Sequence, residues 1–302
     1  MAWYCGWDGG GTTTDICLTD RHGNVLAQRA FGPLNPNGTS RETVEKTVHD
    51  CLGFLASQAD GLAGCEGLVV GTAGISNLEA PRFLEKTIRR YGYDGPLRIV
   101  GDHEIALAGA ICGPGAILIA GTGSICFGRD VHEKTWRCGG YGHLIDDEGS
   151  GYALGRDILA AVVHSLDGRG PSTCLTDAVF QQLRFDDLKQ LITWLYAPET
   201  GKKDVAALAP LLQPALAQSD PAAQRIVFTA AQELTRLVTG VWAKAKLTQG
   251  EIAMTGSILL HFDRLREQTA DLLSQALPQA TIVSPRHSAA WGAADMSRHL
   301  FH

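Results

Sequence analysis

Residues 7–15 read Trp-Asp-Gly-Gly-Gly-Thr-Thr-Thr-Asp, and this stretch decides the fold because its glycines join two segments rich in apolar and β-branched residues. The segments on either side, 3–7 and 12–19, predict two strands connected by a tight turn. The sequence Arg-His-Gly-Asn at 21–24 predicts a second turn, and a third strand is expected over 25–30. The chain therefore begins with three consecutive strands.

The same pattern returns in the middle of the chain. Residues 115–120 predict an apolar strand, Gly-Thr-Gly-Ser at 121–124 a glycine turn, and 125–129 a second strand, with a third expected over 135–138. Setting Gly9 on Gly121 aligns the two glycine turns at an offset of 112 residues. A repeat of this length predicts two lobes of like topology, each with its own strands and core.

Helices are expected between and after these strand groups. One should begin at the N-cap Thr39, because Val44, Val48, Leu52 and Leu55 then lie along one helical face. The other expected elements are strands over 67–71, 97–101, 251–255 and 280–283, and helices over 82–91, 151–165, 175–183, 188–196, 205–218, 221–246 and 258–277, with a last helix after Pro285. The order predicts an α/β fold of two lobes, residues 1–112 with 288–302 and residues 113–287, the second enlarged by helices.

The composition argues against several classes of partner. Net charge is −6, and the 26 Lys and Arg residues form no run that could follow a nucleic-acid backbone. No stretch approaches the ~18 consecutive apolar residues of a membrane helix, so we expect a cytoplasmic protein without a membrane partner. The eight cysteines include no C-x-x-C pair, which favours reduced, structural thiols.

Both glycine turns have the features of phosphate-binding loops. A turn without Cβ atoms lets a ligand approach the backbone, and its unpaired amides suit phosphate oxygens. An ordinary tight turn is the alternative for either loop alone. The expected phosphate contacts are Gly9, Gly10, Gly11, Thr12 and Thr13 in the first turn and Gly121, Thr122, Gly123 and Ser124 in the second, with hydroxyl donors at the rim from Thr12, Thr13 and Ser124.

Asp8 stands just before the first glycine. A carboxylate beside phosphates is repelled unless a divalent cation lies between them, so we expect Asp8 to hold Mg²⁺ directly or through water. The alternative is an aspartate that caps the turn.

Asp102 follows the apolar strand expected over 97–101 and precedes a helical segment. It should therefore lie at the carboxyl end of a buried strand, where open α/β sheets bind ligands. A carboxylate there can accept the proton of an attacking hydroxyl as a general base. The alternative is a helix cap.

Several polar and glycine-rich segments are candidates for an acceptor site. Residues 139–151 combine five glycines with acidic side chains, which fits a sugar-binding loop or, alternatively, an acidic first helical turn capped by Ser150. Thr72 and Gly74 offer amides after a buried strand. Asn35 lies in a proline-stiffened loop and has the alternative reading of a turn residue.

Together these motifs resemble a known superfamily. The first turn, AILIAGTGSICFG at 116–128 and IAMTGSI at 252–258 resemble the phosphate-1, phosphate-2 and adenosine motifs of the sugar kinase, Hsp70 and actin superfamily. Residues 100–124 and 139–155 resemble the N-acetylglucosamine and glucosamine kinases of the BadF/BadG/BcrA/BcrD ATPase family. The resemblance implies two RNase H-like, actin-like ATPase lobes with a central cleft, a homodimer, and use of ATP with Mg²⁺.

The resemblance also implies roles for individual residues. Asp102 would be the catalytic base for phosphorylation of an amino sugar, first N-acetylglucosamine at its 6-hydroxyl, with glucosamine as the closest competitor. Gly256 and Ser257 would meet the adenosine. The implied sugar contacts are Asn35, Asp102, Gly140, Tyr141 and Asp147, with Thr72 and Gly74 facing the same cleft.

Two other functions stay open. The same family contains ATP-driven activators of CoA-linked dehydratases and reductases, which hold an iron–sulfur cluster through cysteines at a dimer interface. Cys126 and Cys138 are the candidate ligands here, although both fall in expected strands. A non-catalytic sugar sensor is the third alternative.

Overall fold

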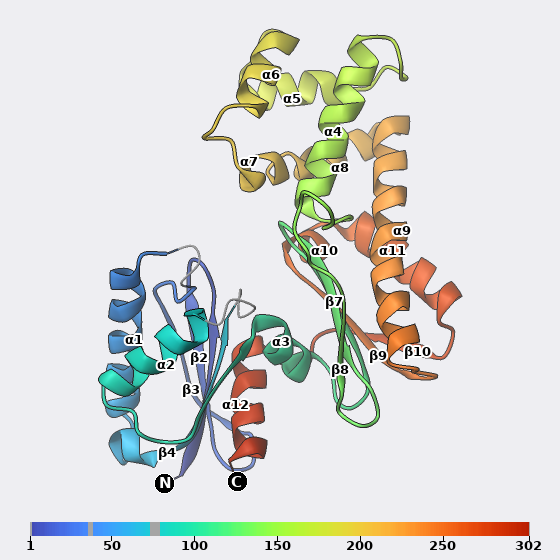
Figure 1. Ribbon diagram of the computed structural model, residues 1–302. Coiled ribbons are helices and arrows are strands. Elements are labelled where there is room, and N and C mark those ends of the chain that lie inside the picture. Colours follow the sequence, from blue (N-terminus) through green and yellow to red (C-terminus); the bar gives the residue numbers. More distant parts are fainter. Residues whose placement is uncertain (1, 36–38, 73–78, 302) are drawn as a thin grey trace. The chain divides into compact units, whose positions relative to one another are not determined.

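The structure, a computed structural model, describes residues 2–35, 39–72 and 79–301. The chain forms two compact units, one of residues 1–112 with 285–302 and one of residues 113–284. Figure 1 shows that the last helix, α12 (Ala289–Leu300), returns to the first strands of the chain. Each unit is therefore described by itself.

The N-terminal unit is built on a five-stranded sheet in the order β3-β2-β1-β4-β5. The first three strands form an antiparallel meander, whereas β4 and β5 run parallel to β1. Parallel strands end at the same edge of a sheet, so the register sets Gly9, Thr72 and Gly101 side by side there. The strands are β1 (Trp3–Gly9), β2 (Thr14–Thr19), β3 (Val25–Phe31), β4 (Cys65–Thr72) and β5 (Leu97–Gly101).

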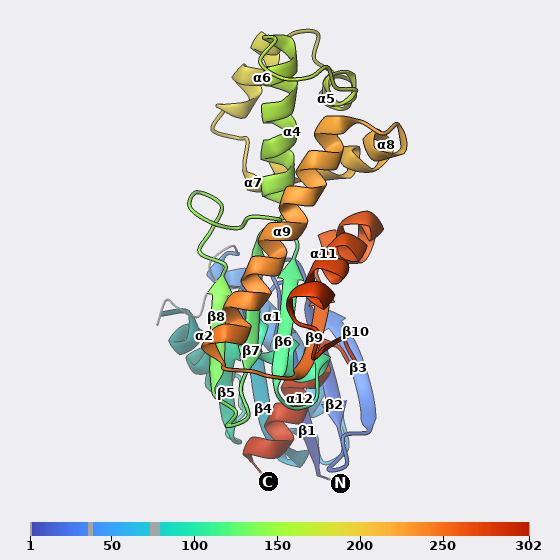
Figure 2. The ribbon, with the colours of Figure 1, turned by 90° about the vertical axis from the view of Figure 1, so that its right-hand side faces the viewer.

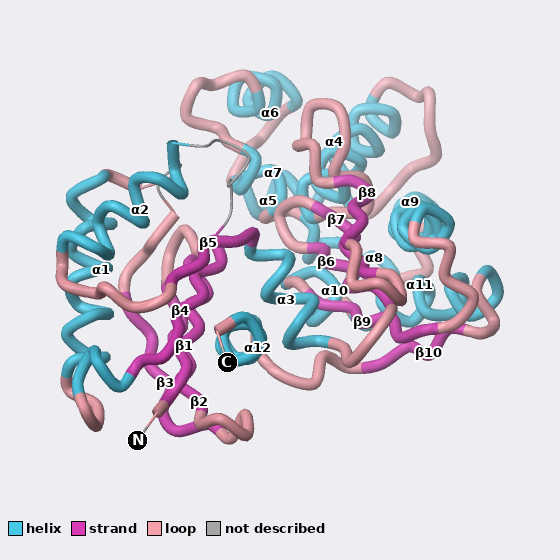
Figure 3. Tube along the Cα trace, turned by 60° about the horizontal axis from the view of Figure 1, so that its bottom comes forward, coloured by secondary structure: helices cyan, strands magenta, loops and turns pink. Residues whose placement is uncertain are grey.

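Helices cover both faces of this sheet (Figure 3). On one face α1 (Arg41–Ala56) and α2 (Glu79–Arg90) pack on a core that includes Trp7, and a short 3₁₀ helix, η1 (Gly61–Gly64), precedes β4. On the other face α3 (Asp102–Ala110) and α12 enclose a smaller cluster around Ile105. The N-cap of α1 is Ser40, whose hydroxyl accepts from Thr43 N, one residue later than expected.

β1 and α12 approach each other closely in this unit. A Cβ at Gly6 would overlap the backbone nitrogen of Ala294, so only glycine lets the helix lie directly on the strand. Small residues on α12 allow the contact from the other side, since Ala290 and Ala294 are buried against Cys17. The first strand and the last helix therefore form one packed core.

The C-terminal unit has a sheet of the same topology. Its order is β8-β7-β6-β9-β10, with β6, β7 and β8 antiparallel and with β9 and β10 parallel to β6. The strands are β6 (Gly115–Ala120), β7 (Ser124–Arg129), β8 (Thr135–Gly139), β9 (Gly250–Thr255) and β10 (Ala280–Val283). The predicted α/β fold of two like lobes is confirmed.

Helices enlarge this unit, as predicted. The long helix α9 crosses the strands in Figure 2, with α11 beside it, and the remaining helices extend the core away from the sheet. The helices are α4 (Gly151–Leu166), α5 (Leu175–Leu183), α6 (Leu188–Leu195), α7 (Lys202–Ala206), η2 (Ala209–Leu211), α8 (Leu212–Ala217), α9 (Pro221–Lys244), α10 (Ser257–His261) and α11 (Asp263–Ala276). No helix among the described residues combines the length and apolarity needed to cross a bilayer.

Three further details differ from the sequence predictions. The helix expected over 205–218 is broken at Pro210, which lacks an amide hydrogen and lies in the short 3₁₀ turn η2. The helix expected over 258–277 is interrupted at Phe262, which leaves the helical conformation and is buried. The hairpins pair Gly9 with Thr14 but Ala120 with Ser124, so the second turn is one residue shorter and the 112-residue offset does not hold.

Candidate active site

The first glycine turn connects β1 to β2. Gly10 N donates to Thr13 O at 2.9 Å, and Gly11, Thr12 and Thr13 are exposed. Within the described part of the chain, the amides of Gly11 and Thr12 form no hydrogen bond. Exposed amides without a Cβ in the way are suited to phosphate oxygens. The turn therefore has the donors expected of a phosphate loop.

The segment after β3 is tied to this turn. Leu34 N and Asn35 N both donate to Gly10 O, at 3.0 and 3.2 Å. A Cβ at Gly9 would lie 2.8 Å from the Leu34 side chain, so the buried Gly9 gives room to Leu34. Asn35, a predicted sugar contact, is thereby held next to the phosphate turn.

Asp8 lies opposite Asp15 in the strand register. Burial, and after it the charges of Asp102 and Asp15, together raise the pKa of Asp8 to about 6. A divalent cation would remove this unfavourable interaction, and Mg²⁺ typically takes one or two carboxylates with phosphate and water as its other ligands. The described residues contain no group of three His, Cys, Asp or Glu side chains that could hold a metal. The Asp8 carboxylate thus fits an Mg²⁺ ion whose other ligands are nucleotide phosphates and water.

Asp102 begins α3 directly after the last residue of β5. Its Oδ1 accepts from the backbone nitrogen of His103 at 2.9 Å, and His103 Nδ1 lies 3.2 Å away. Burial disfavours the ionised carboxylate, but the hydrogen bonds and charge of His103 outweigh burial and hold the pKa of Asp102 below its ordinary value. Asp102 is therefore an ionised carboxylate at the sheet edge, which is the form a general base needs.

The residues around Asp102 at this edge complete the description of the N-terminal unit. The N-cap of α3 is Gly101, whose backbone nitrogen donates to Glu104 Oε1 at 3.0 Å, so Asp102 does not cap the helix. The Thr72 hydroxyl is buried and has no hydrogen-bond partner in the described part of the chain. Gly74 lies outside the described residues.

The second glycine turn connects β6 to β7 in the C-terminal unit. Gly121 N donates to Gly123 O at 2.9 Å. The first turn of α4 is bonded to the same loop, since Gly151 N donates to Gly121 O at 2.8 Å and Tyr152 N to Thr122 O at 3.3 Å. The loop is therefore positioned by both the hairpin and the helix.

Ser124 has a different place from the one expected. Its hydroxyl is buried and donates to Glu148 O at 2.7 Å, so it does not lie at the rim of the turn. Thr14 holds the matching position at the start of β2 and donates to Gly32 O, also at 2.7 Å. In both units this hydroxyl joins the hairpin to a later loop.

A pocket of about 310 Å³ opens beside the second turn. Its lining brings together Gly121, Thr122 and Ser257, which the sequence assigned to the phosphate and adenosine motifs. Gly256 has φ 94°, and a Cβ there would overlap the carbonyl oxygen of Ala120, so glycine is required where the chain passes the end of β6. The pocket has the size of a small-molecule site.

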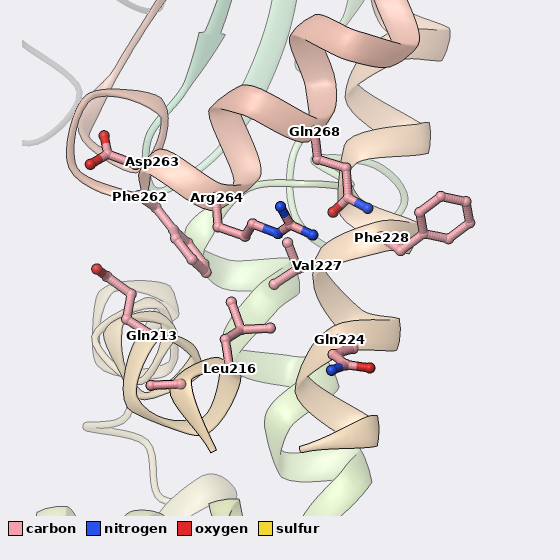
Figure 4. Close-up of a pocket in the computed structure, with 10 residues that line it drawn as sticks. Gln213, Leu216, Gln224, Val227, Phe228, Phe262, Asp263, Arg264 and Gln268 are labelled. Carbon is pink, nitrogen blue, oxygen red and sulfur yellow. The ribbon is translucent and has the colours of Figure 1, made fainter. Parts of the chain in front are cut away.

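Polar side chains missed by sequence reasoning also line this pocket. Lys203, Gln213 and His261 belong to three different helices, and only tertiary packing brings them together. No local motif could have identified them. A larger pocket of about 740 Å³ shares Gln213 and Phe262 with it, and Figure 4 shows the Arg264 side chain extending into this second space.

The loop between β8 and α4 carries Gly140, Tyr141 and Asp147. Asp147 is only 5% exposed, accepts from Ser124 N at 3.4 Å, and has its carboxylate against Gly123. Tyr141 is 65% exposed. Three of the predicted sugar contacts thus share one loop, with Asp147 against the second glycine turn and Tyr141 in solvent.

Arg137, on β8, supports this loop. Its Nε donates to Gly139 O at 2.8 Å, another guanidinium nitrogen donates to Gly140 O, and the guanidinium carbon lies 4.6 Å from the centre of the Tyr141 ring. These contacts fix the carbonyl groups of both glycines of the pair. Sequence reasoning missed Arg137 because an arginine in a strand carries no signal of its own.

The cysteines proposed for the iron–sulfur alternative face each other across β7 and β8. Cys126 is fully buried, which raises its pKa well above the ordinary value, and Cys138 is partly buried. A cluster at a subunit interface needs accessible thiolates. This geometry disfavours the activator function.

Comparison with known proteins agrees with the motifs. An N-acetylmuramic acid/N-acetylglucosamine kinase of Clostridium acetobutylicum is 32% identical over 302 residues and covers 99% of each chain. An N-acetyl-D-glucosamine kinase of Dictyostelium discoideum is 27% identical over 96% of each chain. A solved structure from Chromobacterium violaceum, provisionally named an N-acetylglucosamine kinase, has a TM-score of 0.74 and 26% identity, over 98% of this chain and 99% of its own.

The family itself follows from a match over nearly the whole length. The family model aligns with residues 5–296, from the first strand into the last helix. The match therefore includes both glycine turns, Asp102 and the loop before α4. The chain belongs to the BadF/BadG/BcrA/BcrD ATPase family, as its motifs predicted.

Proposed function

We propose that this chain is an amino sugar kinase that transfers the γ-phosphoryl group of ATP to the 6-hydroxyl of N-acetylglucosamine. Its relatives named above are kinases of amino sugars, which supports the general chemistry. The observation that carries the proposal is Asp102, a carboxylate held in its ionised form at the end of the sheet that also presents the first phosphate turn.

Nucleotide binding is assigned to both glycine turns. The amides of Gly11 and Thr12 would bind phosphate oxygens in the N-terminal unit, and Gly121 and Thr122 would do so in the C-terminal unit, where Ser257 borders the pocket proposed for the adenosine. Mg²⁺, when bound, neutralises phosphate charge. Asp8 is the residue proposed to hold it.

Asp102 is assigned the proton transfer. As the acceptor oxygen bonds to the γ-phosphorus and the bond to the β-phosphate oxygen breaks, the carboxylate takes the hydroxyl proton and ADP leaves. Phosphoryl transfer depends mainly on positioning and charge stabilisation, so a weakly basic but well-oriented carboxylate is sufficient. The remaining sugar contacts are proposed for Asn35, Gly140, Tyr141 and Asp147. A homodimer and a cytoplasmic location stay predictions from the sequence.

The test is a coupled ADP-release assay against N-acetylglucosamine, glucosamine and N-acetylmuramic acid. Asp102→Asn should keep nucleotide affinity and lose turnover by about a hundredfold. Asp94→Asn, which changes an exposed carboxylate before the same strand, is the matched control and should keep wild-type turnover. Unchanged turnover in Asp102→Asn would contradict the proposed base.

The substrate panel separates the other functions. Turnover of glucosamine without turnover of N-acetylglucosamine would indicate a glucosamine kinase. Sugar binding without ADP release from any acceptor would indicate a sensor.

A further inference from the structure

The carboxylate of Asp102 is held asymmetrically. Both hydrogen bonds from His103, through its backbone nitrogen and its Nδ1, reach the same oxygen, Oδ1, at 2.9 and 3.2 Å. Oδ2 has no hydrogen-bond partner in the described part of the chain. The Asp102 side chain is 50% exposed and that of His103 is 19% exposed. One oxygen is thus fixed by the protein, and the other is left for a ligand.

The direction of the side-chain bond follows from the chemistry of its atoms. An ionised carboxylate only accepts hydrogen bonds, so His103 Nδ1 must carry the hydrogen. The ring also packs on Gly101, two residues earlier in the chain. A Cβ at Gly101 would overlap His103 Cε1 and would lie 2.9 Å from both ring nitrogens. Gly101 has φ −69°, a conformation open to any residue, so it is the ring and not the backbone that requires glycine.

The residues around the ring make this arrangement rigid. Gly101 is the N-cap of α3, and its amide donates to the Glu104 carboxylate at 3.0 Å. This bond fixes the first helical turn, which carries both Asp102 and His103. The glycine, the ring and the helix start therefore together determine where the Asp102 carboxylate points.

We propose that His103 is a positioning residue for the reaction, which holds Asp102 Oδ1 so that Oδ2 receives the proton of the acceptor hydroxyl. The inference rests on the proposed kinase function and assigns within it a residue that touches Asp102 and not the substrate. A charged hydrogen bond from Nδ1 also keeps the carboxylate ionised, in agreement with its lowered pKa.

Few other ionisable groups act on this carboxylate. Asp8, at the end of β1, interacts with Asp102 through its charge, and Asp15 acts on Asp8 in turn. Glu104 shares the first turn of α3 and is bonded to Gly101. The other ionisable side chains of the packed elements lie elsewhere: Glu66 and Arg98 near the starts of β4 and β5, and Asp295, Arg298 and His299, which pair with one another on α12.

The test compares three substitutions of His103. Asn places a side-chain N–H near the position of Nδ1 and should retain most of the turnover. Gln places its amide one bond farther out and Leu has no donor, so both should lower kcat by about tenfold, the effect of one charged hydrogen bond. KM for ATP should stay unchanged in all three. In the His103→Leu and His103→Gln variants, the acidic limb of the pH profile of kcat/KM should move to higher pH, because Asp102 loses the hydrogen bond that lowers its pKa.

Two results would overturn the inference. Leu and Asn variants with the same loss of kcat would indicate a role in packing only, and a Leu variant with wild-type kcat and an unmoved acidic limb would indicate no role. The pKa of Asp102 measured by carboxyl NMR gives a readout independent of turnover, and it should rise more in the Leu variant, which loses both the side-chain hydrogen bond and the charge of His103, than in the Asn variant, which loses only the charge. If the wild type phosphorylates no amino sugar, the kinase proposal fails, and the NMR result then decides on the hydrogen bond alone.

Discussion

Replacing Asp8 by Asn should make the nucleotide-free protein more stable at neutral pH. The pKa of Asp8 rises from an ordinary value of 3.8 to about 6, through burial and then through the charges of Asp102 and Asp15. A folded-state pKa above the unfolded value means that stability is fully present below the unfolded pKa and is lost as the pH rises through the folded pKa. The rise in the pKa of Asp8 from 3.8 to about 6 corresponds to ~3 kcal/mol, which is the upper limit of the gain in Asp8→Asn.

Urea denaturation in the presence of a chelator, from about pH 4 to about pH 8, measures this effect. The free energies of unfolding of the wild type and of Asp8→Asn should nearly coincide at the acid end of this range. They should separate as the pH rises through about 6, with Asp8→Asn the more stable protein. Asp20→Asn is a control of opposite sign. Hydrogen bonds from Asn24 lower the pKa of Asp20. The wild type should therefore have a higher free energy of unfolding than Asp20→Asn at neutral pH, and this difference should disappear on acidification.

Mg²⁺ and ATP should reverse the order of stability, because only the wild type has the carboxylate that we propose holds the cation. Equal stability of Asp8→Asn and wild type at neutral pH without ligand would refute the electrostatic reasoning. A variant less stable than the wild type at every pH would refute it as well. In either case the argument for a cation at this position would lose its physical basis.

Three further substitutions test the packing of the site. Gly256→Ala should abolish nucleotide binding in calorimetry, because its Cβ would overlap the Ala120 carbonyl; retained affinity would contradict the pocket. Gly6→Ala should lower the free energy of unfolding by ~3 kcal/mol through its clash with α12, whereas Gly53→Ala, which meets nothing within 4 Å, should not; equal effects would refute the contact. Arg137→Met should raise the sugar KM about tenfold and leave the ATP KM unchanged, since charged hydrogen bonds to the loop are lost; parallel changes in both would indicate general damage.

Local signals in the sequence were sufficient for the strand framework. Glycine turns between apolar segments placed both hairpins, because strand formation and turn chemistry are encoded within a few residues. The residue-by-residue alignment of the two hairpins could not be predicted from these local signals. It depends on whether a turn closes between Gly10 and Thr13 or between Gly121 and Gly123, and glycine permits either.

The residues of the candidate site show the same contrast between local signals and tertiary packing. The position of Asp102 could be predicted from the sequence, because a carboxylate directly after a buried strand lies at the sheet edge. The role of His103 could not be predicted, since it depends on how the His103 ring packs on Gly101. Ser124 was placed at the rim because nothing local shows that its hydroxyl reaches Glu148 O across 24 residues of chain.

The position of α12 has a consequence for biosynthesis. Residues 290–294 seal the strand that contains Gly6, so the core around this strand is complete only after a segment that the ribosome makes much later has been added. The middle of the chain, by contrast, carries every strand of its own sheet within residues 115–283 and can close first. Loss of α12 through a premature stop codon would therefore expose the face of these strands that α12 covers to chaperones and proteases.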